Sequence, residues 1–132
     1  MMAVVWEFRC YVNGGGVNEI RAWFDKQSPS VRGKFISRLQ TLRQLDPELW
    51  VPKPFRWLRH ECSGLGEIRF EVGNVQFRPL GFRTDFTFTM VFCAIEKGGK
   101  FEPANACAKG LTRKSEIHAD AKRSCPHDFI LD

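Results

Sequence analysis

Two arginines, Arg69 and Arg78, lie in a stretch of sequence that predicts a β-hairpin, GLGEIRFEVGNVQFRPLGF at residues 64–82. Gly73 and Asn74 have the composition of a two-residue hairpin turn. Counting outward from that turn pairs the facing residues in the order Val72–Val75, Glu71–Gln76, Phe70–Phe77 and Arg69–Arg78. Because side chains alternate between the two faces of a strand, the arginines share one face, away from the phenylalanines. The sequence therefore predicts two guanidinium groups side by side on one sheet surface.

Like charges that face each other directly destabilise an antiparallel pair, on a scale of about 0.2–1 kcal/mol. One interpretation is that the diagonal neighbours Glu67 and Glu71 neutralise the arginines. The other is that the two guanidinium groups form a fork that binds a phosphate. Pro79 affects both interpretations, because proline removes a ladder donor and indicates an edge position or a bulge.

The other residues with reactive side chains show no recognised motif. The histidines His60, His118 and His127 are scattered, and the glycines at 13–16 lack the spacing of a phosphate-binding loop. The five cysteines are odd in number and include no CxxC pair. We interpret them as reduced thiols rather than as a disulfide framework or a zinc site. They are Cys10, Cys62, Cys93, Cys107 and Cys125.

The elements that must position the hairpin follow from the hydrophobic period. Residues 4–12 are rich in β-branched and aromatic types and predict a strand. A helical period begins at Val17 and is broken at Ser28-Pro29, which suit the N-cap and first turn of a second helix. Apolar residues then recur at helical spacing, at Val31, Phe35, Leu39 and Leu42.

The second half of the chain predicts the rest of a sheet. A proline-containing loop at 47–63 precedes the hairpin, and a third strand is expected at 86–95. A weak helical stretch follows, and then a tail or short docking segment at 124–132. The order β-α-α-β-β-β-α predicts one α+β domain over residues 1–132 with a largely antiparallel sheet.

Composition narrows the class of partner. The chain has 132 residues, and its 20 lysines and arginines against 15 aspartates and glutamates give a net charge of +5. This balance mildly favours an anionic partner such as nucleic acid or an acidic protein. No apolar run approaches the roughly 20 residues that span a bilayer, so we expect a cytoplasmic protein.

The segment from the hairpin onward resembles the RelE/HigB-type bacterial toxins, in particular the phage-derived Gp49-like branch. Gly64-Leu65-Gly66-Glu67-Ile68-Arg69 resembles the family's G-L-x-E-L-R run, and Phe77-Arg78 resembles its aromatic-Arg strand. Arg56-Trp57-Leu58 stands where the family has K-x-L. Further matches are Lys97 and Lys100 in the lysine cluster, and then Pro103 and Arg113. The strongest part of the resemblance covers residues 55–113.

The resemblance implies a RelE/ParE-like fold and a type II toxin that cleaves mRNA in the ribosomal A site. The family uses neither metal nor cofactor, and the 2′-OH of the RNA is the nucleophile. Arg69 and Arg78 would then hold the scissile phosphate, and Lys97 and Lys100 would transfer protons or stabilise charge. The other residues implied at the RNA are Arg56 and Arg113 on the backbone and Phe82 on a base, although Phe82 also fits a core position on a curved sheet. Some relatives place a catalytic residue near His118.

The family's usual partner is a helix-turn-helix antitoxin encoded by an adjacent gene. Two alternatives to the nuclease stay open. Glu96 replaces a lysine of the cluster and Gly110 replaces an alanine, which favours a catalytically decayed module that binds an antitoxin or a host protein. A toxin of the same fold that targets gyrase is the other alternative, and the hairpin arginines favour RNA over it.

Overall fold

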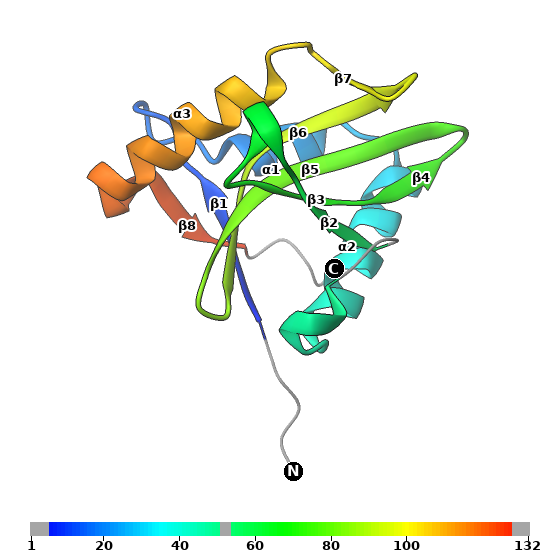
Figure 1. Cartoon of the computed structure of the whole chain (residues 1–132), viewed down its shortest axis with the longest axis horizontal. Helices are drawn as coiled ribbons and strands as arrows, with labels where there is room; N and C mark the ends of the chain where they lie inside the picture. The colour runs from blue at the N-terminus through cyan, green and yellow to red at the C-terminus, as the bar shows by residue number, and fades with distance from the viewer. Residues whose placement is uncertain (1–5, 51–53, 128–132) are drawn as a thin grey trace.

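The computed structural model describes residues 6–50 and 54–127, which are built around a mixed eight-stranded sheet (Figure 1). The strand order is β2-β3-β5-β6-β1-β8, with β4 also paired to β5 and β7 to β6. β1 runs parallel to β6, whereas the other strand pairs are antiparallel. The strands are β1 (Glu7–Tyr11), β2 (Phe55–Trp57), β3 (Gly66–Ile68), β4 (Phe70–Val72), β5 (Val75–Thr84), β6 (Thr87–Lys97), β7 (Lys100–Glu102) and β8 (Ser124–Pro126). The predicted α+β class and the largely antiparallel sheet are confirmed.

The described residues contain three α-helices, which lie on both faces of the sheet (Figure 1). α1 (Glu19–Asp25) and α2 (Pro29–Arg43) bury their apolar side chains in the larger core, together with Phe70, Phe77 and Phe88 of the sheet. α3 (Ala106–Ala119) packs on the opposite face, against Leu80, Phe82 and Val91. Short 3-10 helices lie at Pro47–Leu49, His60–Cys62 and Ala121–Arg123.

α2 forms where the sequence predicts it. The hydroxyl of Ser28 accepts a hydrogen bond from the Val31 amide at 3.2 Å, so it caps the helix, and Pro29 occupies its first turn. The buried residues of α2 are the predicted ones, Val31, Phe35, Leu39 and Leu42. This apolar stripe faces the hairpin, since the rings of Phe35 and Phe70 lie 5.9 Å apart.

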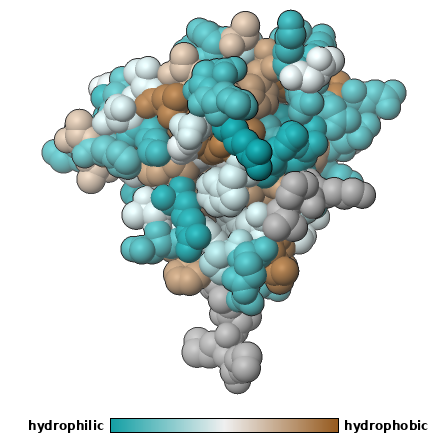
Figure 2. Space-filling view, viewed as in Figure 1, coloured by the Kyte–Doolittle hydropathy of each residue, from teal (hydrophilic) through white to brown (hydrophobic). Residues whose placement is uncertain are grey.

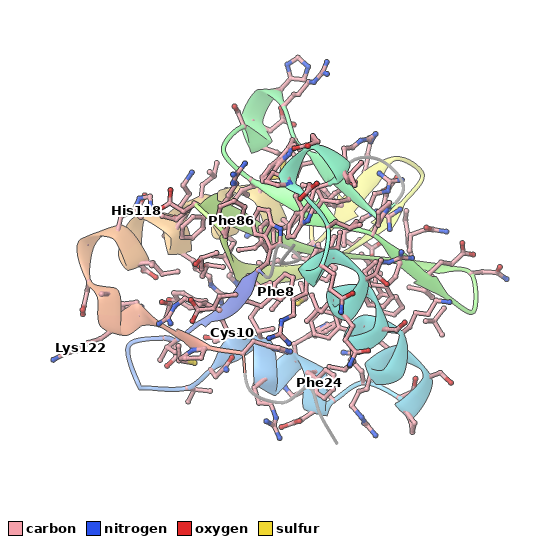
Figure 3. The ribbon with its side chains drawn as sticks, turned by 90° about the horizontal axis from the view of Figure 1, so that it is seen from below. Phe8, Cys10, Phe24, Phe86, His118 and Lys122 are labelled. Atoms are coloured by element: carbon pink, nitrogen blue, oxygen red, sulfur yellow. A yellow bond between two sulfur atoms is a disulfide. The ribbon has the colours of Figure 1, made fainter. Side chains whose placement is uncertain are left out.

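Aromatic side chains fill the larger core. The rings of Trp6 and Trp50 stack at 4.0 Å, and their indole N–H groups donate to the carbonyls of Leu45 and Leu42. Both polar groups are therefore satisfied inside an apolar environment, as a buried tryptophan requires. In Figure 3, Phe8 and Phe24 lie inside the fold, whereas Lys122 points away from it. Figure 2 shows that hydrophilic residues cover most of the surface in view, with smaller hydrophobic areas between them.

One sequence expectation for a connecting segment needs correction, because the predicted loop at 47–63 contains the edge strand β2, which pairs with β3. The segment at 124–132, expected to be a tail or a short docking segment, begins with β8, which docks on β1 with Cys125 opposite Cys10. Residues 128–132 lie outside the described residues. Within 6–50 and 54–127, no helix is long and apolar enough to cross a membrane.

The expectation that all five thiols are reduced is wrong, because Cys62 and Cys107 form a disulfide. Cys62 ends the 3-10 helix before β3, and Cys107 lies in the first turn of α3. These residues are 45 positions apart, so only the packing of α3 onto this face of the sheet brings them together. The disulfide therefore ties α3 to the segment that leads into the arginine hairpin.

Candidate functional site

The hairpin register matches the prediction from sequence. Val72 faces Val75, Glu71 faces Gln76 and Phe70 faces Phe77. Gly73 and Asn74 both have positive φ, of 55° and 67°, which is the conformation of a type I′ turn. Beyond Arg69 the same count continues, since Glu67 faces Leu80. Arg69 therefore lies opposite Arg78, although it belongs to neither β3 nor β4.

Pro79 explains the break between β3 and β4 without shifting the register. Counting from the turn places Pro79 opposite Ile68 at a hydrogen-bonded pair, where proline has no amide to donate. The Arg69 amide points the other way and donates to the Pro54 carbonyl at 2.9 Å. The edge position inferred from Pro79 is wrong, because β5 has neighbours on both sides. The bulge expected near it occurs one step later, between Leu80 and Gly81, on the β6 side.

The two arginines meet at a buried carboxylate. One oxygen of Glu67 lies 2.6 Å from Nη1 of Arg69 and 3.8 Å from Nε of Arg78. The interpretation that Glu67 neutralises the pair is confirmed, whereas Glu71 is exposed on the outer strand β4. Arg56 faces Glu67 from β2 and is exposed. We call this group the arginine cluster, and its members are Arg56, Glu67, Arg69, Arg78 and Glu96.

Arg78 is the most enclosed arginine of the arginine cluster, with 3% of its side chain exposed. Its Nε donates to Glu96 at 2.8 Å, its Nη1 to the Phe77 carbonyl at 2.8 Å and its Nη2 to Gln76 at 3.0 Å. A buried guanidinium needs such partners, because an uncompensated buried charge destabilises a fold by about 3–5 kcal/mol. Arg69 differs, since a quarter of its side chain is exposed and it can present donors to a ligand.

Burial raises the pKa of Glu67 above its ordinary value of 4.5. The positive charges of Arg69, Arg78 and Arg56 act in the opposite direction and lower it, but burial has the larger effect. A carboxyl group with a raised pKa beside several cations has the character of a proton-transfer group. Sequence reasoning included Glu67 only as a counter-charge, because its burial depends on the packed sheet.

Glu67→Gln tests this pKa through stability. Because the folded pKa lies above the unfolded one, ionised Glu67 lowers the stability of the wild type as pH rises through that window. Glutamine does not titrate. The free energy of unfolding of the variant, relative to that of the wild type, should therefore increase as pH rises from about 4.5. Urea unfolding over a pH series measures the difference, with Glu71→Gln as the control for an exposed carboxylate. A difference that stays constant with pH would refute the raised pKa.

A β-bulge in β6 places Glu96 beside Arg78. Leu80 faces Phe92 but Gly81 faces Met90, so Val91 is an extra residue in β6. Because one inserted residue reverses which face every later side chain takes, Glu96 comes to the side of Arg78 instead of the opposite side. The Val91 carbonyl accepts a hydrogen bond from Nη1 of Arg113 at 2.9 Å, so α3 supports the bulge.

Gly81 is needed at this bulge for steric reasons. A Cβ at position 81 would lie 2.4 Å from the Thr89 carbonyl oxygen and 2.6 Å from the Phe88 ring. Gly81→Ala should therefore lower the free energy of unfolding by about 1–3 kcal/mol. Gly33→Ala is the matched control, because Gly33 lies within α2 with open space at its Cβ position and should stabilise by about 0.5–1 kcal/mol. Urea denaturation of both variants measures this, and equal stability of Gly81→Ala and wild type would contradict it.

Three other residues that the sequence analysis considered for RNA binding or catalysis make contacts within the fold itself. Arg113 is largely buried; it binds Glu19 at 3.4 Å and stacks on the Tyr11 ring at 4.6 Å, so it links α3 to α1 and β1. Phe82 is 4% exposed and lies in the core under α3, as the alternative to base stacking anticipated. His118 touches the edge of Phe82 from α3 and is exposed.

The predicted lysines lie at the turn between β6 and β7. Lys97 faces Lys100 across Gly98 and Gly99, and Lys97 also lies 3.7 Å from Glu102. The register places both lysine side chains on the face of Ile95 and not on that of Glu96. The sheet therefore brings Arg56, Arg69 and Arg78 together. It leaves the two lysines on its other face, at the turn between β6 and β7.

Comparisons with protein-family models, with curated proteins and with solved structures find no match to this chain. The arginine cluster and the resemblance of residues 55–113 are therefore the observations from which a function can be inferred.

Proposed function

We propose that the protein is the toxin of a type II toxin–antitoxin pair and that it is a ribosome-dependent mRNA endoribonuclease of the RelE/HigB type. One observation supports this proposal most strongly: Arg69 and Arg78 meet at Glu67, with Arg56 across from it. The proposal includes a RelE/ParE-like arrangement of the N-terminal strand, the helical pair, the antiparallel strands and α3.

The proposed reaction needs two tasks from these side chains, the stabilisation of charge and the acceptance of a proton. The 2′-oxygen of the RNA bonds to phosphorus and gives up its proton, while the bond from phosphorus to the 5′ oxygen breaks and the 5′ oxygen takes a proton from water. Arg69, assisted by Arg56 and Arg78, stabilises the negative charge on the phosphoryl oxygens. The proposal takes Glu67 as the proton acceptor, because it is the carboxylate in contact with Arg69 and burial raises its pKa.

The proposed partners follow from the same chemistry. The substrate is mRNA in the A site of the small ribosomal subunit, in the cytoplasm. The inhibitor is a helix-turn-helix antitoxin encoded next to this protein. Lys97 and Lys100 are exposed at the turn between β6 and β7, and they would contribute long-range attraction to RNA phosphates.

Induced expression in a bacterial host tests this function. Growth should stop within a few generations, and mRNA should acquire new 5′ ends inside coding regions. Co-expression of the neighbouring helix-turn-helix protein should restore growth. Soluble protein that changes neither growth nor transcript ends would refute the proposal.

A specific observation favours a second candidate, a non-catalytic module of the same fold that binds an antitoxin or host protein. Arg78 is buried and already bonded to Glu96, Gln76 and the Phe77 carbonyl. A toxin site that lost its activity would have this internally satisfied arrangement. Toxicity that depends on Arg69 would exclude this candidate.

A further inference from the structure

The Nε–H of Arg78 is bonded to a carboxylate of the protein itself. Glu96 accepts this hydrogen bond at 2.8 Å, at the side chain that the proposed function assigns to an RNA phosphate. Carboxylate and phosphate oxygens bind guanidinium groups in the same way, as charge-assisted acceptors. In the free protein, Glu96 therefore already occupies the place on Arg78 where a phosphate oxygen would bind.

The two carboxylates of the arginine cluster differ in how easily their side chains can move away from the arginines. The Glu67 side chain is 2% exposed and contacts both Arg69 and Arg78. The Glu96 side chain is 27% exposed and lies one residue before the end of β6. The Glu96 backbone is paired with Gln76 of β5 on one side and with Phe101 of β7 on the other, so a departure from Arg78 would involve the side chain alone. Glu67 is thus placed to hold the arginines, and Glu96 to move away.

We propose that Glu96 is an internal stand-in for phosphate, and that a phosphodiester of single-stranded RNA displaces it from Arg78 on binding. This inference rests on the proposed function and adds its regulation. One anion exchanges for another, so Arg78 keeps a compensating charge throughout the exchange. The free protein is accordingly closed at Arg78, and a ligand that also binds the exposed Arg56 and the partly exposed Arg69 gains further contacts that favour opening it.

Binding of a fluorescein-labelled short single-stranded RNA, followed by anisotropy, tests the exchange. Glu96→Gln removes the competing charge but keeps an acceptor of the same shape, so RNA should bind about tenfold more tightly than to wild type. Glu71→Gln is the matched control, because it removes the same charge from the same face of the sheet at an exposed position next to Gln76. It should change the affinity by less than about twofold.

Inorganic phosphate is the second probe, and it is independent of RNA cleavage. Phosphate should raise the melting temperature of Glu96→Gln more than that of wild type, because it binds the folded state. If Glu96→Gln does not fold, Glu96→Asp retracts the same charge by one methylene and should show both effects in weaker form. Tighter binding of both probes without any mRNA cleavage would support the stand-in and refute the nuclease. Equal binding by Glu96→Gln and wild type, or by Glu96→Gln and Glu71→Gln, would overturn the stand-in.

Discussion

Arg69→Ala is expected to lower the rate of mRNA cleavage by about 10²–10³-fold, the usual loss when one charge-stabilising donor is removed from an active site. Arg69 is the candidate whose guanidinium both contacts Glu67 and retains exposure to a ligand. Arg69→Lys keeps the charge but loses the planar fork, so it should retain an intermediate rate. The rate at which wild type, Arg69→Ala and Arg69→Lys cleave a defined mRNA bound to ribosomes measures this series.

The control for this series is Lys34→Ala, which removes one positive charge from the exposed side of α2. It should cleave within about twofold of wild type if bulk charge has little effect. Circular dichroism should show the same fold for every variant, because Arg69 is partly exposed and Glu67 keeps Arg78 as a partner. Equal loss of activity in Lys34→Ala and Arg69→Ala would refute a specific role for Arg69.

The replacement of both Cys62 and Cys107 by serine is expected to lower the free energy of unfolding by about 2–4 kcal/mol. The disulfide closes a long loop, because its two cysteines are 45 positions apart in the sequence, and this restricts the unfolded chain. It also fixes the first turn of α3 against the segment that leads into β3. Leu65 and Phe82 are buried in the core cluster that α3 covers. Urea denaturation under oxidising conditions measures the loss.

A reducing agent provides the control for the disulfide. Dithiothreitol should destabilise the wild type by a similar amount and leave the double serine variant unchanged. A wild type whose unfolding midpoint is the same with and without dithiothreitol would contradict a stabilising disulfide between these cysteines.

Local signals in the sequence predicted the elements that depend on local physics. Ser28 and Pro29 marked the start of α2 because a cap and a first-turn proline act within a few residues. Gly73 and Asn74 marked the hairpin because few other residues adopt positive φ at both positions of a turn. From that turn alone, the facing of Phe70 with Phe77 and the shared face of the arginines followed.

Features that depend on long-range packing could not be predicted in this way. The bulge at Val91 has no proline or turn motif in the sequence. It nevertheless decides which face of the sheet Glu96 takes, and therefore that Glu96 accepts a hydrogen bond from Arg78. The Cys62–Cys107 disulfide joins segments that meet only after α3 docks on the sheet. The role of Arg113 was likewise inferred from resemblance, whereas its contacts with Val91 and Glu19 arise from the meeting of three elements.

The most direct test of the nuclease is the chemistry of the cut. Purified protein is incubated with bacterial ribosomes carrying an mRNA whose A-site codon contains either ribose or 2′-deoxyribose at one nucleotide. The predicted result is cleavage after the ribonucleotide, with a 2′,3′-cyclic phosphate on the upstream fragment, and no cleavage after the deoxynucleotide. An mRNA that stays intact on the ribosome, or one that is cut equally well at the deoxynucleotide, would contradict the proposed function.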